Sequence, residues 1–383
     1  MLYIGYTRRN YVAERVIQGA WHPDIEFRRV PHLSLRRLAR RPFWRHATGY
    51  LATGRADLVH LSHEVGWGDR PFVATFEDEV PVGRRRSPRA GDAGLRRLAS
   101  RRCRAVLMMS EDARRRFEAD TRAYAPLAEK CMVCGPCVPG ADAAHARFLA
   151  RQVERARTGR RGPLQVLFVG VQFFRKGGDF VLDALEPLAA GSEPGVRLTI
   201  VSPFEPDGYV TPADGARVKA VKRRVASLPW VRRVDYVDPV VLRETMATSD
   251  LLALPTLDET FGFVLVEALA TGLPVATTSV RAIPEILPVG EHAFAVDLRT
   301  GPDGGWEGIR LWRTAGDVAY ARAWEDARER CVEGIRRRVA AVLAEGGASA
   351  PLARARRAHY EARFTPEVVG DRLEAIYRRA LGG

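Results

Sequence analysis

The sequence predicts an α/β protein built from two doubly wound domains in series. Its 383 residues are too many for one ordinary core. Short apolar runs alternate with helical patterns, which is typical of a parallel sheet with helices on both faces. A polar, Arg-rich stretch at residues 151–163 interrupts that alternation, which then restarts, and we interpret it as a linker. We therefore expect one domain at residues 1–155 and a second at 163–350. A C-terminal helical segment, 351–383, should pack back toward the first domain.

The elements can be placed in order along the chain. In the first domain we expect strands at residues 2–5, 25–30, 57–61, 71–76, 104–109 and 131–134, with helices such as 95–101 and 111–119 between them. In the second we expect strands at 164–169, 197–201, 234–237, 251–254, 275–277 and 293–296, and helices at 179–188, 212–226, 240–247 and 262–271. Two such domains usually enclose a cleft, and ligands bind at the carboxyl ends of the strands.

Composition and charge restrict the class of protein. Apolar residues make up 46% and charged residues 28%, as in a soluble globular protein. The longest apolar runs fall short of the roughly 18 residues that a membrane span needs. The basic residues near the N-terminus follow the first apolar run, which is the wrong order for a signal peptide. We therefore expect a cytoplasmic protein.

The positive charge is concentrated in the first domain. Residues 1–155 hold 29 Lys and Arg against 17 Asp and Glu, whereas the rest of the chain carries only +2 of the net +14. Such an excess favours an anionic partner. Residues 27–55 mix Arg pairs with Leu, Phe and Trp, and a helix from about Leu33 would suit the anionic inner face of a membrane. The alternative is a surface helix packed on its own domain. Nucleic acid is not expected, because no recognition module is found.

Three cysteines, Cys131, Cys134 and Cys137, form a CxxCxxC run. No second cluster of Cys and His completes a metal site. We interpret them as structural cysteines, and a metal site remains the alternative.

The loop FVGVQFFRKGGDFVL, residues 168–182, carries the first candidate site. Its glycines stand between an expected strand and an expected helix, where backbone N–H groups and the helix N-terminus favour an anion. Arg175 and Lys176 add two positive charges, so a phosphate or diphosphate fits best. The alternative is a solvated basic turn.

The stretch DETFGFVLVEALATGLPV, residues 258–275, carries the second. Glu259 lies in a loop after an expected strand, and Glu267 stands inside an otherwise apolar helix. Burial of that carboxylate without a partner would be costly, and the hydroxyls of a ribose would supply two donors. The alternative is a Glu on a solvated strip of the helix.

These residues resemble a known family. The spacing Glu259-x7-Glu267, followed by ALATGLPVATT and IPEIL, is similar to the Glu-x7-Glu signature of retaining GT-B glycosyltransferases, specifically glycosyltransferase family 4. GVQFFRKGG is similar to the diphosphate loop of that family. The resemblance is strong over residues 164–288, fair at the tail, and weaker over the first 150 residues.

The resemblance implies a GT-B fold of two Rossmann-like domains facing across a cleft, and a role for each matching residue. Glu259 would contact the transferred sugar, and Glu267 would hold the ribose. Backbone N–H groups of Phe261, Gly262 and Phe263 would bind the diphosphate, and Lys176 would neutralise the leaving phosphate. Such preorganised donors stabilise the charge that develops on departure. No metal or other cofactor is implied.

The sequence departs from the family pattern at several positions. Val171 stands where the family has an Arg in the diphosphate loop, so we expect Arg175 to supply the second charge there. Arg281-Ala282 replaces a Gly-Gly pair. Glu77 stands where the first domain commonly has a His that faces the cleft, and we include it as a candidate catalytic residue.

We therefore predict a retaining glycosyltransferase that uses a nucleoside-diphosphate sugar. The acceptor would be a glycan, a glycolipid or a small molecule, met by the basic first domain. The alternatives are a nucleotide-sugar epimerase, a phosphorylase of the same architecture, or a non-catalytic homologue that binds nucleotide sugars.

Overall fold

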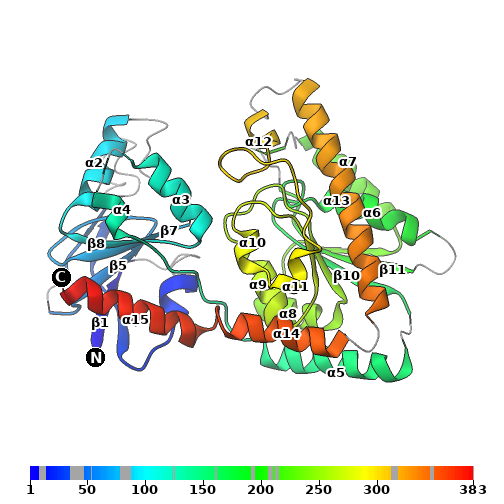
Figure 1. Ribbon diagram of the computed structural model, residues 1–383, viewed down its shortest axis with the longest axis horizontal. Coiled ribbons are helices and arrows are strands. Elements are labelled where there is room, and N and C mark those ends of the chain that lie inside the picture. Colours follow the sequence, from blue (N-terminus) through cyan, green and yellow to red (C-terminus); the bar gives the residue numbers. More distant parts are fainter. Residues whose placement is uncertain are drawn as a thin grey trace. The chain divides into compact units, whose positions relative to one another are not determined.

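The protein folds into two compact units (Figure 1). Unit 1 contains residues Met1–Pro139 and Ala362–Gly383, and unit 2 contains Gly140–Glu361. The computed structural model describes residues 1–7, 14–34, 47–52, 54–77, 88–122, 124, 126–159, 162–190, 195–205, 210–211, 215–311, 318–345 and 349–382.

Unit 1 is built on a parallel sheet with the strand order β2-β1-β5-β7-β8-β9. All six strands were expected from the sequence, and each lies within one residue of its expected ends. Their bounds are β1 (Leu2–Tyr6), β2 (Ile25–Arg29), β5 (Leu58–Ser62), β7 (Phe72–Phe76), β8 (Cys103–Met108) and β9 (Cys131–Val133).

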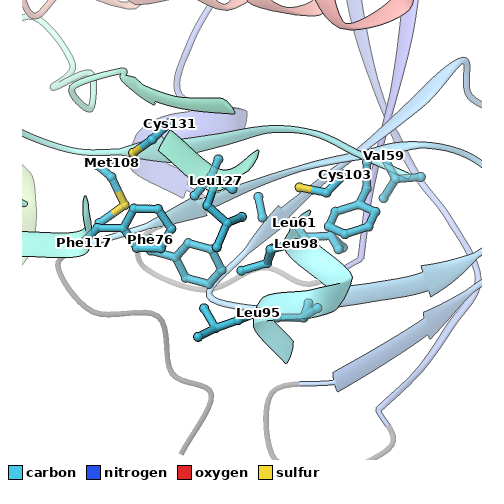
Figure 2. Packing of buried hydrophobic residues seen from close by; sticks show 14 of the residues in the cluster. Val59, Leu61, Phe76, Leu95, Leu98, Cys103, Met108, Phe117, Leu127 and Cys131 are labelled. Atoms are coloured by element: carbon cyan, nitrogen blue, oxygen red, sulfur yellow. The ribbon is translucent and has the colours of Figure 1, made fainter. Parts of the chain in front are cut away.

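Successive side chains of the central strands alternate between two cores, as the period of a strand requires. On β8, Val106 and Met108 join the core under helices α2 (Pro88–Ala99), α3 (Glu111–Asp120) and α4 (Pro126–Lys130), which Figure 2 shows. Ala105 and Leu107 point to the opposite core, which includes side chains of the C-terminal helix α15 (Pro366–Gly382). Helix α15 therefore belongs to unit 1, although the chain enters it from unit 2.

A buried histidine links α15 to the sheet. The Nδ1 atom of His60 lies 2.6 Å from the hydroxyl of Tyr377, and its Nε2 atom lies 2.6 Å from Thr75 Oγ1. Burial lowers the pKa of His60 to about 3, so the ring is neutral in the folded protein. Its ring therefore serves as a neutral hydrogen-bonding link within unit 1.

A second, small sheet of unit 1 was not expected. It has the order β3-β4-β6, formed by β3 (His32–Ser34), β4 (Ala47–Tyr50) and β6 (Val65–Gly68). The amphipathic helix predicted from Leu33 is wrong at that start, because Leu33 lies in β3 and pairs with Gly49. Residues 35–46 of the predicted segment lie outside the described residues, and residues 47–50 form strand β4 rather than a helix. A π-helical turn, Glu14–Gln18, also belongs to this unit.

Unit 2 is built on a parallel sheet with the strand order β12-β11-β10-β13-β14. The bounds are β10 (Leu164–Val169), β11 (Val196–Val201), β12 (Val231–Val234), β13 (Leu251–Leu254) and β14 (Val275–Thr277). The strand predicted at residues 234–237 lies three residues earlier. The strand predicted at 293–296 is only an isolated bridge, which joins Val296 to Thr278.

Helices cover both faces of this sheet (Figure 1). On one face of the sheet, α6 (Gly178–Leu185) packs against the long α13 (Val318–Ala344). The other face is covered by α8 (Pro239–Thr248) and α9 (Phe263–Thr271). An outer layer formed by α5 (Asp142–Thr158) and α14 (Ser349–Glu361) packs on these two helices. Helix α7 (Gly215–Ser227) packs beside β12. Short elements complete the unit: η4 (Glu186–Leu188), α10 (Ile283–Ile286), α11 (Val289–His292) and α12 (Gly308–Leu311).

The linker predicted at residues 151–163 is wrong. Helix α5 continues to Thr158, and its arginines have partners within unit 2. Arg151 donates to Asp250 Oδ1 at 3.0 Å, and Arg155 forms an ion pair with the same carboxylate. These arginines hold α5 against unit 2. The division between the two units falls earlier in the chain, between Pro139 and Gly140.

The packing of α13 and α14 depends on a buried ion-pair network. Glu291 is 5% exposed and accepts hydrogen bonds from Arg338 at 2.7 Å and from Arg356 at 2.7 Å. Arg338 also donates to the carbonyl of Val275 in β14. The carboxylate therefore joins two helices to the edge of the sheet.

The cysteines of the CxxCxxC run are free and buried. Burial raises the pKa of Cys131, Cys134 and Cys137 to about 12, so the thiols are protonated near neutral pH. The thiol of Cys137 donates to the carbonyl of Arg15 at 2.9 Å. These contacts agree with their interpretation as structural residues.

Among the described helices, none has both the length and the apolar character that crossing a bilayer requires.

Candidate functional site

The candidate site lies where the strand order of unit 2 reverses. The chain runs from β10 outward to β11 and β12, then returns to the other side of β10 to form β13 and β14. Strands β10 and β13 are parallel neighbours, so the loops after Val169 and Leu254 leave the same edge of the sheet. Ligands of open α/β sheets bind at such a reversal.

The loop after β10 is held tightly against the loop after β13. Gly177 adopts a φ of 74°, which favours glycine, and a Cβ atom there would lie 2.3 Å from the carbonyl oxygen of Pro255. A hydrogen bond of 2.9 Å from Leu257 N to Arg175 O joins the same two loops. Glycine is therefore required for the close approach that brings Lys176 beside the second loop.

Lys176 and Glu259 form an ion pair between these loops. Their side chains are 13% and 11% exposed. Burial lowers the pKa of Lys176 below its ordinary value, while the carboxylate of Glu259 opposes that effect. The two residues that the sequence assigned to the leaving phosphate and to the sugar are thus in direct contact and partly removed from water.

The other predicted cation, Arg175, is engaged within the loops. Its Nη1 atom donates to the carbonyl of Asp258 at 2.7 Å, and its Nε atom donates to Gln172 at 2.6 Å. The guanidinium therefore fixes the loop that carries Glu259. The donor-binding role that the sequence assigned to Arg175 stays a prediction.

Helix α9 begins directly after this loop, at Phe263. Its N-cap is Gly262, with a φ of 96°, which offers no side chain to the backbone N–H groups of the first turn. A Cβ at Gly262 would lie 3.4 Å from Cγ of Glu259, so the helix start and the carboxylate are neighbours. Phe261 is buried, and its ring centroid lies 5.4 Å from that of Phe263. A helix N-terminus in this position favours a bound anion.

Glu267 is less buried than its apolar neighbours suggested. It is half-buried, as are Phe263 and Val264, whereas residues 265, 266 and 268–271 are buried. Positions 263, 264 and 267 share one helix face. The carboxylate therefore lies on the most open face of α9, one turn beyond the end that points toward the ion pair.

Unit 1 has its own reversal of strand order, between β1 and β5. Just beyond these strands, Thr7 Oγ1 donates to Glu64 Oε2 at 3.0 Å in a buried hydrogen bond. His63 adopts a φ of 54°, and its Nε2 atom lies 3.7 Å from Glu77 Oε2. Glu77, at the end of β7, thus belongs to a polar group at the carboxyl edge of unit 1. Sequence reasoning missed His63 and Glu64, because single polar residues after strands carry no distinguishing pattern.

The structure thus brings together Arg175, Lys176, Glu259 and residues 261–263, with Glu267 on the adjoining helix, while Glu77 lies in the other unit. Sequence reasoning noted Arg281 only as a departure from the family pattern and gave it no role; its Nε atom donates to Asp258 Oδ1 at 2.9 Å. Within the described part of the chain, no group of three or more His, Cys, Asp or Glu side chains is arranged to hold a metal ion.

Comparison with known sequences identifies a family for this region. Residues 163–308 match the family of glycosyl transferases group 1. D-inositol 3-phosphate glycosyltransferase of Mycobacterium marinum is 29% identical over 217 residues, which cover 52% of this chain and 44% of that protein. Glycogen synthase of Mycobacterium tuberculosis is 34% identical over 152 residues, or 40% of this chain and 33% of that protein. The chain thus spans less than half the length of these curated relatives.

Solved structures show the same architecture over nearly the whole chain. Anabaena HepE, in complex with UDP and glucose, superposes with a TM-score of 0.52 at 16% identity, covering 99% of this chain and 100% of HepE. WaaG, a glycosyltransferase involved in lipopolysaccharide biosynthesis, gives a TM-score of 0.55 at 18% identity, covering 97% and 99%. The predicted GT-B fold of two Rossmann-like domains is confirmed. Residues 163–308, the part that matches the family of glycosyl transferases group 1, contain the whole Lys176–Glu259 site.

Proposed function

We propose that this protein is a retaining, metal-independent glycosyltransferase of family 4, which moves a sugar, such as a hexose, from a nucleoside-diphosphate donor to an acceptor. The observation that carries the proposal is the Lys176–Glu259 ion pair at the strand reversal of unit 2, beside the N-terminus of α9. A cation and a helix N-terminus suit a diphosphate, and the carboxylate beside them suits sugar hydroxyls.

Each residue then has a distinct role. Lys176 and the backbone N–H groups at Phe261, Gly262 and Phe263 stabilise the charge that accumulates on the departing diphosphate. Glu259 contacts the transferred sugar, and Glu267 receives the hydroxyls of the ribose. Lys176 is paired with Glu259, so a diphosphate would compete with that carboxylate for the ammonium group.

The acceptor would bind to unit 1, with Glu77 and His63 at the carboxyl edge of its sheet. The basic excess of residues 1–155 favours an acceptor with negative charge, or one held in an anionic membrane surface. A glycan, a glycolipid or a small molecule would meet these requirements, and such a reaction belongs to polysaccharide or glycoconjugate synthesis in the cytoplasm.

A thermal-shift screen tests donor binding. UDP, GDP and ADP and their glucose conjugates would be added to the full chain and to Lys176→Met. UDP-glucose has priority because HepE is solved with UDP and glucose. A ligand at 100 times its dissociation constant stabilises the folded state by about 2.7 kcal/mol. A shift in the wild type that is absent in Lys176→Met supports the site, and no shift with any nucleotide contradicts it.

Product analysis separates transfer from the alternatives. A transferase consumes the donor at a substantial rate only when an acceptor is present, and it yields a product of retained anomeric configuration. An epimerase converts the donor without an acceptor, and a phosphorylase requires inorganic phosphate. A non-catalytic homologue binds the nucleotide and leaves it unchanged.

A further inference from the structure

Arg281 has an unusual backbone conformation. It follows β14 and precedes α10, and its φ is 54°, a region that residues other than Gly, Asn and Asp seldom adopt. Its N–H donates to the carbonyl of Gly304 at 3.0 Å. A side chain at such a position carries a steric cost, which persists only where the surrounding contacts compensate for it.

The guanidinium of Arg281 supplies those contacts. It is 10% exposed, and it joins two loops that are distant in sequence. Its Nε atom donates to Asp258 Oδ1 at 2.9 Å, and its Nη1 atom donates to the carbonyl of Asp303 at 2.6 Å. Its Nη2 atom lies 3.2 Å from Asp303 Oδ2. A Cβ at Gly305 would lie 2.6 Å from that Nη2 atom, so the guanidinium packs directly on the turn formed by residues 301–305.

Asp258 connects this group to the candidate site. Its side chain is 13% exposed and faces Arg281, while its carbonyl accepts from Arg175 at 2.7 Å and from Thr256 at 2.8 Å. The next residue is Glu259, which pairs with Lys176. Asp258 is thus held at both its side chain and its backbone, immediately before the carboxylate that faces the ion pair.

Two adjacent carboxylates in a poorly hydrated loop repel each other, and each needs its own cation. Here Arg281 neutralises Asp258, and Lys176 neutralises Glu259. Without Arg281, the partly buried carboxylate of Asp258 would lose the cation that it contacts, and the loop would rearrange to expose it or to bring it closer to Lys176.

We propose that Arg281 is a positioning residue that acts through Asp258 to hold loop 256–260, and therefore Glu259, in the geometry used for sugar transfer. The inference rests on the proposed function only for the role of Glu259; the mechanical link between Arg281 and the loop is independent of it.

Hydrogen exchange in the free, full-length protein tests that link. Arg281→Gly suits the observed φ and removes the side chain, whereas Arg281→Lys keeps the charge without the fork of donors. Arg299→Lys, at a 63% exposed arginine that pairs with Asp326, serves as the control. We expect amide exchange in residues 256–260 to accelerate by about tenfold or more in both Arg281 variants and not in the control, because removing one member of a buried pair is costly. Unchanged exchange in Arg281→Gly overturns the proposal, and exchange in β10 and β11 reports whether the domain is still folded.

A double-mutant cycle tests whether Arg281 acts through Asp258. Asp258→Asn should accelerate exchange in the same loop, and Arg281→Gly/Asp258→Asn should show little more than the larger single effect. Effects that simply add would mean that Arg281 acts elsewhere, and would overturn this assignment.

Kinetics then connect the loop to catalysis. In Arg281→Gly we expect kcat for transfer from UDP-glucose, GDP-glucose or ADP-glucose to fall by about ten- to a hundredfold, because a misplaced carboxylate weakens the reactive geometry. The Kd of the matching nucleoside diphosphate, from calorimetry, should change by less than about threefold, which is within 0.7 kcal/mol or so. An equal loss of nucleotide affinity and activity would overturn the positioning role. If the wild type binds none of these nucleotides, the proposed function fails, and the exchange experiment still decides whether Arg281 holds the loop.

Discussion

Replacing either member of the Lys176–Glu259 ion pair should destabilise the protein, but the two replacements should have opposite effects on stabilisation by a bound nucleotide. Either single change, Lys176→Met or Glu259→Gln, leaves a partly buried group without its partner. Breaking a buried pair in this way costs about 3–5 kcal/mol, and side chains that are 13% and 11% exposed place this pair near the lower value. Unit 2 runs from Gly140 to Glu361, and for a domain of that size about 3 kcal/mol corresponds to a fall in Tm of about 6–12 °C.

The double variant, Lys176→Met/Glu259→Gln, removes both charges and should be more stable than either single variant, because no unbalanced charge remains.

The two single variants should also differ in how much a nucleotide stabilises them. In Glu259→Gln the ammonium group is released from its carboxylate and a repulsive negative charge is gone, so UDP, GDP or ADP should stabilise this variant more than the wild type. In Lys176→Met the stabilisation by the same nucleotide should be lost.

Scanning calorimetry of the full chain, with and without each nucleoside diphosphate, measures both effects. Glu325→Gln is a matched control, because Glu325 is 54% exposed and pairs with an arginine of the same helix at 2.7 Å. An exposed pair of this kind is worth about 0–1 kcal/mol. The reasoning is refuted if the single variants behave like this control, or if nucleotide stabilises Lys176→Met as much as it stabilises the wild type.

Three further predictions concern stability. Burial lowers the pKa of His60 from 6.5 to about 3, so near pH 5 the imidazole is protonated in the unfolded chain but not in the folded protein. The contribution of His60 to the free energy of unfolding is therefore fully present above pH 6.5 and falls by about 2 kcal/mol between pH 8 and 5. Urea denaturation of the wild type and His60→Gln at both pH values measures it, and identical pH dependence would contradict it. Gly177→Ala should lower the free energy of unfolding by about 1–2 kcal/mol because of its φ of 74° alone, and by more because the new Cβ would collide with the carbonyl of Pro255. Gly215→Ala is the control, because a Cβ there meets nothing within 4 Å. Equal melting temperatures of the two variants would refute the steric argument. Glu291→Gln should cost about 3 kcal/mol in thermal denaturation, because its buried partners Arg338 and Arg356 then keep only the carboxylate of Glu345 as a countercharge. A loss below 1 kcal/mol would show that Glu291 is not needed to balance the network.

The sequence predicted the parallel sheets well because their strands are short, apolar and separated by helical patterns. Strand β10 was expected at residues 164–169, where the structure has it, since a buried run that ends in a glycine leaves little choice of boundary. The interpretation of residues 151–163 failed for the opposite reason. A helix whose arginines reach a carboxylate 95 or more residues away has the same composition as a solvated linker. Its partner, Asp250, is visible only when the chain is folded.

The same limit applies to the site. Lys176 and Glu259 could be selected because each follows a strand that ends in a recognisable turn, and parallel neighbours place such turns at one edge. Arg281 could not, because its role depends on the turn at residues 301–305 and on a left-handed backbone conformation. A departure from the family pattern marked the position, but nothing in the sequence connected it with Asp258.

The structure changes the physical reason for assigning Glu267 to the ribose of a nucleotide, and the assignment stays a proposal. A carboxylate among apolar neighbours suggested a buried charge that required a partner. The structure instead puts Glu267 on the half-buried face of α9, together with Phe263 and Val264. Its cost of burial is therefore smaller, and its proposed role depends on position. A diphosphate held at the N-terminus of α9 would leave the attached ribose within about one helical turn, or about 5 Å, of this face, where the carboxylate can accept from its hydroxyls.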